Sequence, residues 1–321
     1  MNRVTLKAWF LIFRPWSYTA TFVPFLVAAG FFGSESAHWG RWGLGFVCGL
    51  FFQATVNLLN TWGDERSGVD AVPGAVRTTP QVHEGLVSMR ALFCVAALCA
   101  CAAGALGTGL CFFRADGAWH VDLPLLAAGF VGFLGSTNYS TGIKFKYRGL
   151  GVPFVAFLMG PLEIFVAGEL LCPHPSFAAL SAGLAPGAVR GFCILALPVA
   201  ALGCVIMHGN DMRDIPTDRL AGISTPSTLL GPRGALSLYW FCHLLPYLVC
   251  AKLCMIEKSA TLLLPYFALP LTVRTLWKAT SVYRSAPKNP PWRGLERASG
   301  GIHCVFGVLY AAALAWFRTC T

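Results

Sequence analysis

Residues 43–62 read GLGFVCGLFFQATVNLLNTW, a run of twenty residues without a charged side chain. A helix that crosses the apolar core of a bilayer needs roughly 20 consecutive apolar residues. Residues 91–113 and 191–210 form two further runs that lack Asp, Glu, Lys and Arg. Runs of this length predict an all-α integral membrane protein, because a helix satisfies its own backbone polar groups inside lipid.

The composition of the whole chain agrees with this fold class. Of its 321 residues 56% are hydrophobic and 12% are charged, and its mean hydropathy is +0.62. Soluble domains carry about 25% charged residues, so the composition excludes a water-soluble surface of this size. We predict a single domain over residues 1–321, with about nine transmembrane helices around a central cavity and cytoplasmic cap loops. The expected helix centres lie near residues 22, 51, 102, 132, 161, 200, 244, 268 and 309.

The net charge of +10 is explained by topology. With nine spans, 17 of the 24 Lys and Arg residues lie on the side of the N-terminus, 6 lie on the other side, and Arg274 is unassigned. Positively charged loops stay in the cytoplasm, so the richer side is expected to be cytoplasmic. We therefore expect an inner or plasma membrane protein that contacts the lipid bilayer and no nucleic acid.

Two polar segments follow apolar runs at matching positions. Asn60 and Asp64 end the second predicted span, and Asn210 and Asp214 end the sixth, with an offset of 150 residues in both cases. Residues four apart lie on one face of a helix, so each pair projects from one helix end. The matched pairs suggest two diverged halves, roughly residues 1–140 and 141–321, that face each other across the cavity.

The residue types in these segments favour metal and phosphate chemistry. Asp218 continues the ladder of Asn210 and Asp214 by one more turn. Mg²⁺ prefers oxygen ligands and is usually shared between one or two carboxylates and substrate phosphates. Three cations, Lys144, Lys146 and Arg148, occur within five residues on the same predicted side. Solvated loop acids and a positive-inside flank are the ordinary alternatives for these groups.

Together these segments resemble the UbiA superfamily of intramembrane aromatic prenyltransferases, and most of all its branch that prenylates 1,4-dihydroxy-2-naphthoate in menaquinone biosynthesis. The first motif of the branch is similar to residues 60–70, NTWGDERSGVD, which include its SG-x-D context. The second motif is similar to residues 210–222, NDMRDIPTDRLAG. The run KYRGLG at residues 146–151 and the pair Arg14-Pro15 also look like that branch.

The resemblance implies Mg²⁺-dependent transfer of a polyprenyl group from a prenyl diphosphate to a dihydroxynaphthoate, giving a demethylmenaquinone-type product. The expected metal ligands are Asn60, Asp64, Asp70, Asn210, Asp214 and Asp218. The expected diphosphate contacts are Arg77, Lys144, Lys146, Arg148 and Arg213. The expected catalytic residues are Asp64, Asp214, Asp218, Lys146 and Tyr139, whose ring face would stabilise an allylic cation. Gly68 stands where the superfamily often has an acid, so Asp70 is the expected substitute.

Two groups of alternatives stay open at the level of sequence. The acceptor could be another aromatic compound, such as an isomeric naphthoate, 4-hydroxybenzoate, or a haem or chlorophyll precursor. A cation-coupled transporter would also place acids in the membrane, although it would not need two acidic clusters beside a basic loop.

Glu163 lies inside an apolar span, where an ionisable group is costly and often functional. The family pattern assigns it no role.

Overall fold

The computed structural model describes residues 3–67, 80–112, 121–171 and 188–320. Within these ranges the regular structure is helical, with one isolated bridge between Arg148 and Ser224. The helical elements in chain order are α1(Arg3–Phe13), η1(Pro15–Tyr18), α2(Thr19–Phe32), α3(Trp39–Ser67), α4(Pro80–His83), α5(Met89–Phe112), α6(Leu123–Asn138), η3(Phe145–Tyr147), α7(Gly151–Phe157), η4(Leu158–Leu162), α8(Glu163–Leu171), α10(Ala188–Leu220), α11(Pro226–Glu257), η5(Ala260–Ala268), α12(Leu269–Ser285) and α13(Leu295–Cys320).

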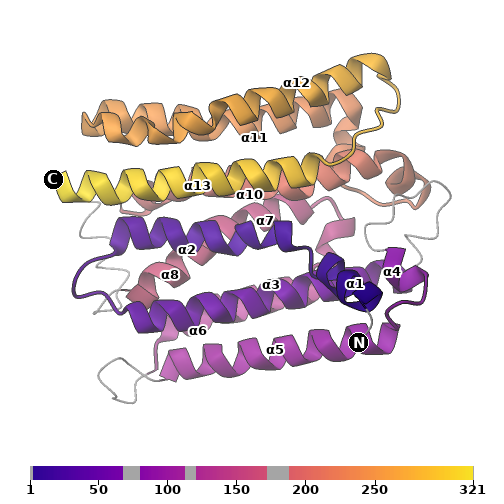
Figure 1. Ribbon diagram of the computed structural model, residues 1–321, viewed down its shortest axis with the longest axis horizontal. Helices are drawn as coiled ribbons and strands as arrows, with labels where there is room; N and C mark the ends of the chain where they lie inside the picture. The colour runs from indigo at the N-terminus through magenta and orange to yellow at the C-terminus, as the bar shows by residue number, and fades with distance from the viewer. Residues whose placement is uncertain (1–2, 68–79, 113–120, 172–187, 321) are drawn as a thin grey trace.

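The long helices lie side by side in a bundle. Figure 1 shows α11, α12 and α13 along one side of the bundle and α5 along the opposite side. Contacts between α10 and α11, α3 and α5, and α13 and α2 hold the layers together. Helices α3 and α10 carry the two Asn–Asp pairs in their last turns. The fold therefore positions both motifs at the ends of long apolar helices, as the sequence predicts.

Local sequence explains where several elements begin and change. Helix α11 begins with a capping box, in which the Thr225 hydroxyl accepts from the Thr228 backbone N–H and the Thr228 hydroxyl accepts from the Thr225 backbone N–H. Between α7 and α8 the chain makes a π-helical turn, η4, that contains Pro161. Next to it, a Cβ on Gly160 would lie 2.6 Å from the Ala200 Cβ, so glycine allows η4 to pack closely on α10.

The prediction of an all-α membrane fold is confirmed. Six helices of the described residues are long and apolar enough to cross a bilayer: Trp39–Arg66, Met89–Phe112, Gly151–Leu171, Ile194–Leu220, Pro226–Glu257 and Leu295–Cys320. Each of the nine expected centres lies within a helical element, including the shorter α2, α6 and η5. The count of nine spans and the division into two halves stay predictions.

We expect both motifs to map to the cytoplasmic side of the membrane. The side-chain contacts described below bring Asp64 and Lys146 together, and the C-terminal end of α13 lies at the opposite end of the bundle from α1 and α4 (Figure 1). Cysteine-accessibility labelling should therefore place Asp64, Lys146 and Asp214 on the cytoplasmic side and Thr321 on the other. Labelling of Asp64 and Asp214 from different sides would contradict a single site.

Candidate active site

The end of α3 binds a lysine from the loop that follows α6. The Lys146 Nζ donates to both carboxylate oxygens of Asp64, at 2.9 and 2.8 Å, and to the Asn60 Oδ1 at 3.2 Å. Asn60 and Asp64 are both buried, and the Lys146 ammonium forms an ion pair with the Asp64 carboxylate. Burial alone would lower the pKa of Lys146, but Asp64, Tyr147 and Tyr139 together outweigh it and raise the pKa above its ordinary value.

Two tyrosines stand beside this pair. The Tyr147 hydroxyl donates a short hydrogen bond to the Asp64 Oδ1. Sequence reasoning did not single out Tyr147, although it belongs to the KYRGLG run. Tyr139 is 4% exposed, and its hydroxyl has no hydrogen-bond partner among the described residues. Burial and, next, Asp211 raise the pKa of Tyr139, so its hydroxyl stays neutral.

The end of α10 repeats the arrangement with a different cation. The Arg213 guanidinium forms a two-pronged pair with Asp214, with Nε to Oδ1 at 2.7 Å and Nη2 to Oδ2 at 2.6 Å. The Arg213 Nη1 also donates to the Asn210 Oδ1 at 3.1 Å. On the other side of the guanidinium, Glu296 at the start of α13 lies 3.9 Å from Nη1. Sequence reasoning missed Glu296, because nothing in its local pattern marks it.

Asp211 and Asp218 connect the two halves of the site. Both are buried, at 5% and 8% exposed. Asp218 interacts electrostatically with Asp214 on its own helix and with Asp64 and Lys146 across the site. Asp211 interacts with Asp218, Asp214 and Lys146. The predicted ladder of α10 and the predicted pair of α3 therefore face one another, and Asp211, which is not among the expected ligands, joins them.

Of the other residues predicted to bind the metal or the diphosphate from the loops, two are exposed and two lie outside the described residues. Lys144 has a left-handed backbone, with φ of 59°, and its exposed side chain lies 6.0 Å from the centre of the Tyr147 ring. Arg148 is also exposed, and its backbone pairs with Ser224 after α10. Asp70 and Arg77 lie outside the described residues. Of the three cations in the basic loop, Lys146 is the one whose side chain contacts an acidic residue of the two motifs, as far as the described residues show.

The oxygen ligands present fit a magnesium ion that is shared with a phosphate. Within the described ranges no three His, Cys, Asp or Glu side chains lie close enough to hold an ion by themselves. Mg²⁺ does not need such a cage, because it commonly binds one or two carboxylates together with substrate phosphates and water. Two separate Asn–Asp pairs, each rich in oxygen, match that mode of binding better than a closed structural metal site.

Two cavities lie near the two Asn–Asp pairs. The smaller, of about 80 Å³, is lined by Asn60, Asn210 and Tyr139 among others. The larger, of about 290 Å³, lies between α3, α5, α6 and the η4–α8 segment and is mainly apolar. Ser136, Leu158 and Met159 line both of them, so the two cavities are direct neighbours inside the bundle.

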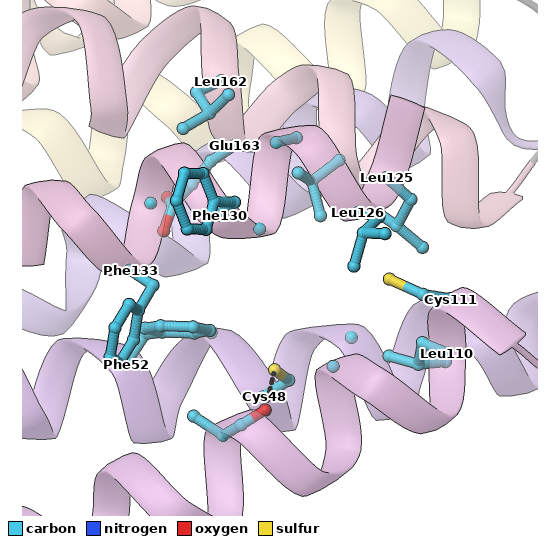
Figure 2. Close-up of a pocket in the computed structure, with 18 of the residues that line it drawn as sticks. Cys48, Phe52, Leu110, Cys111, Leu125, Leu126, Phe130, Phe133, Leu162 and Glu163 are labelled. Carbon is cyan, nitrogen blue, oxygen red and sulfur yellow. Dashed lines mark hydrogen bonds between the residues drawn. The ribbon is translucent and has the colours of Figure 1, made fainter. Parts of the chain in front are cut away.

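Glu163 lies in the wall of the larger cavity. Figure 2 shows it with the apolar side chains of Phe52, Phe130 and Phe133 around the opening. The Thr21 hydroxyl donates to the Glu163 Oε1 at 3.2 Å, and the Oε2 is buried without a partner among the described residues. The carboxyl group is thus the main polar feature of an otherwise apolar chamber.

The wall of the smaller cavity holds a network of polar side chains from η1 and α3. The Asn57 Nδ2 donates to the Ser17 hydroxyl at 2.8 Å, and the Gln53 Nε2 donates to the Asn57 Oδ1 at 3.3 Å. The buried Gln53 Oε1 has no hydrogen-bond partner in the described part of the chain. Arg14 joins the same wall and donates to Thr61 at 3.1 Å. Within the described residues, the wall of this cavity therefore carries both hydrogen-bond donors and an unpartnered acceptor.

A helical membrane bundle with two facing Asn–Asp pairs and an attached apolar cavity defines a class of enzyme that acts on a diphosphate with an apolar tail. The sequence profile of the UbiA prenyltransferase family matches residues 21–300. The chain belongs to the UbiA prenyltransferase family. This result confirms the prediction of an aromatic prenyltransferase and disfavours the transporter alternative.

Similarity to known proteins extends over almost the whole chain and supports this assignment. UbiA prenyltransferase domain-containing protein 1 of Gallus gallus is 29% identical over 97% of this chain and 87% of its own length. The Homo sapiens protein of that name is 28% identical, covering 97% of this chain and 86% of its own. Among solved structures, a UbiA homolog from Archaeoglobus fulgidus bound to GPP and Mg²⁺ has a TM-score of 0.60 at 16% identity, covering 96% of this chain and 99% of its own. At that identity the likeness shows the fold, and its ligands agree with the predicted cofactor and donor.

Proposed function

We propose that the chain transfers a polyprenyl group from a prenyl diphosphate to a dihydroxynaphthoate, with Mg²⁺ as cofactor and a demethylmenaquinone-type product. The observation that carries this proposal is that Asp218 interacts with both Asp64 and Asp214, while Asn60 and Asn210 of the same two motifs line a cavity that adjoins a mainly apolar one. A prenyl diphosphate has the same division into a multiply charged head and an apolar tail. The homologue solved with GPP and Mg²⁺ supports this donor class.

The charged head of the donor would lie between the two helix ends. Asn60, Asp64, Asn210, Asp214 and Asp218, together with Asp70, would hold Mg²⁺, which neutralises the diphosphate as it leaves. Lys146 and Arg213 are half-buried cations that pair with these ligands, and they would stabilise the negative charge that develops on the leaving group. Lys144, Arg148 and Arg77 are proposed to contact the diphosphate from the outer side of the loops.

The allylic cation that remains needs a dry and electron-rich environment. Tyr139 lines the smaller cavity, and its neutral ring presents a face that attracts a cation. The adjoining apolar cavity would bury the prenyl tail and exclude water, which would otherwise capture the cation. Glu163 would then lie beside the tail, one helical turn beyond Met159 of the shared wall.

The proposed acceptor rests on the SG-x-D and KYRGLG contexts and on the polar wall of the smaller cavity. The unpartnered Gln53 Oε1 can accept a hydrogen bond from a ring hydroxyl, and Arg14 can attract a ring carboxylate. Hydroxyl groups push electron density onto the neighbouring ring carbon, which attacks the cation. In 1,4-dihydroxy-2-naphthoate that carbon carries the carboxylate, so the new C–C bond forms as CO₂ leaves.

A panel of acceptors tests this assignment. Membranes that contain the protein are incubated with Mg²⁺, a labelled prenyl diphosphate, and either 1,4-dihydroxy-2-naphthoate, an isomer with its carboxylate on the other ring, 1,4-dihydroxynaphthalene or 4-hydroxybenzoate. We expect 1,4-dihydroxy-2-naphthoate to give the fastest transfer, with release of one CO₂ per product. Exclusive prenylation of 4-hydroxybenzoate would contradict the naphthoate assignment and leave prenyl transfer intact.

The proposed location follows from the distribution of Lys and Arg residues along the chain. The basic side of the chain predicts an active site that opens toward the cytoplasm from an inner or plasma membrane. A water-soluble prenyl acceptor would reach the smaller cavity from that side, while the donor's tail would enter from the lipid.

A further inference from the structure

Each Asn–Asp pair of the site already holds a cation that belongs to the protein. The Lys146 ammonium contacts the Asn60 amide oxygen and both oxygens of Asp64, all within 3.2 Å. The Arg213 guanidinium contacts the Asn210 amide oxygen and both oxygens of Asp214, all within 3.1 Å. In both pairs the cation therefore binds the equivalent three oxygens: the Asn amide oxygen and the two Asp carboxylate oxygens. The cation is a lysine in the first pair and an arginine in the second.

These oxygens are also the proposed ligands of Mg²⁺. A carboxylate whose two oxygens both accept from one ammonium or guanidinium has fewer lone pairs to offer to a second cation. The Lys146 ammonium donates to both oxygens of Asp64, so it competes with a metal for them. Because hydrogen bonds to charged groups are among the stronger ones in proteins, such competition lowers the affinity for a metal measurably.

We infer that Lys146 and Arg213 are exchangeable counter-ions, which occupy the two Asn–Asp pairs before the substrate binds and move to the diphosphate when Mg²⁺ takes their place. This inference rests on the proposed function. It explains why strongly binding cations lie directly on the expected metal ligands. It also implies that metal and diphosphate bind together, because the diphosphate supplies the new partner that each released cation needs.

The surroundings of the two cations are suited to such an exchange. Lys146 lies on a loop that follows α6, and its side chain interacts with Asp211 and Asp218 as well as with Asp64. Arg213 has a second carboxylate, Glu296, at 3.9 Å on the side away from Asp214. Each cation therefore keeps a negative neighbour when it leaves its pair, which lowers the cost of the movement.

The test measures binding of the metal alone, without diphosphate. Mn²⁺, which also prefers oxygen ligands, is titrated into the purified full-length protein, and the free ion is counted by electron paramagnetic resonance. We expect Lys146→Gln to bind Mn²⁺ about tenfold more tightly than the unchanged protein, equivalent to about 1.4 kcal/mol. The same variant should bind Mn²⁺–pyrophosphate more weakly. Arg213→Gln should shift both affinities in the same directions.

Two further variants separate the exchange from a general charge effect. Lys146→Arg keeps a cation on Asp64 and should bind Mn²⁺ alone within about threefold of the unchanged protein. Lys252→Gln removes an exposed lysine from the far part of α11 and should leave the Mn²⁺ affinity unaltered.

A measurement on the unchanged protein covers the outcome in which the Lys146 variant fails to fold. The rate at which an amine-reactive reagent modifies Lys146 is followed by peptide mass spectrometry. It should rise when Mg²⁺ is added alone and fall when pyrophosphate is added as well. The inference would be overturned by a rate of Lys146 modification that does not change when Mg²⁺ is added. A Lys146→Gln variant that binds Mn²⁺ no better than the unchanged protein would also overturn it. A protein that transfers no prenyl group and binds no metal with pyrophosphate would instead overturn the proposed function.

Discussion

Replacing Asp64 by Asn should lower the rate of prenyl transfer by roughly 10²–10³-fold, and replacing Asp214 by Asn should do the same. Asparagine keeps the size of the side chain and removes the charge that would hold Mg²⁺ against the diphosphate. It also removes the carboxylate that forms the closest ion pair with Lys146 or Arg213. The measurement is the transfer of a labelled prenyl group at saturating Mg²⁺, with the amount of membrane-inserted protein determined on the same samples.

Glu65→Gln is the matched control for this prediction. Glu65 follows Asp64 directly, is half-buried, and does not line either cavity near the motifs. The same change of charge at that position should lower the rate by less than about tenfold, because screened charges near a surface contribute little. If both Asp variants transfer prenyl groups at the normal rate, the assignment of the metal ligands is wrong.

The sequence predicted those parts of the fold that depend on local physics. A charge-free run of twenty residues has few options other than a membrane helix, so the positions of α3, α5 and α10 followed directly. The spacing of four between Asn60 and Asp64 also determined that they share a helix face. The π-helical turn at Leu158–Leu162 was beyond such reasoning, because it depends on how that segment packs against α10.

The choice among neighbouring cations does not follow from charge spacing alone. By spacing Lys144, Lys146 and Arg148 look equivalent, the family resemblance singles out Lys146 as catalytic, and the contact with Asp64 comes from Lys146. The reason is conformational: the left-handed backbone of Lys144 and the bond from the Lys146 N–H to the Tyr139 carbonyl turn the loop so that Lys146 points inward. Neither feature can be deduced from the spacing of the charged residues.

The expected ligands do not include Asp211, although its spacing marks it. It lies seven residues before Asp218 and three before Asp214, so all three side chains share one face of α10. Its burial could not be predicted from this spacing, because it depends on how α11, α13 and α7 cover α10.

Gly132→Phe should distinguish long from short prenyl donors. Gly132 lies one turn below Ser136 of the shared wall and lines the apolar cavity, where a Cβ would have its nearest neighbour, the Leu162 side chain, at 4.0 Å. A phenyl ring there would fill space that the tail needs. Excluding four methylene groups of tail costs about 3 kcal/mol, or roughly 100-fold in binding. We therefore expect about 100-fold slower transfer from subsaturating geranylgeranyl diphosphate.

Dimethylallyl diphosphate should be used within about threefold of the normal rate, because its five carbons end before the blocked turn of α6. Ala127→Phe on the same helix is the control: Ala127 is exposed and does not line the cavity, so a ring there would point to lipid and leave both donors unaffected. Equal losses with both donors in Gly132→Phe would mean that the substitution disturbs the catalytic end of the bundle. Unchanged use of the long donor, with the variant folded, would show that the tail lies elsewhere.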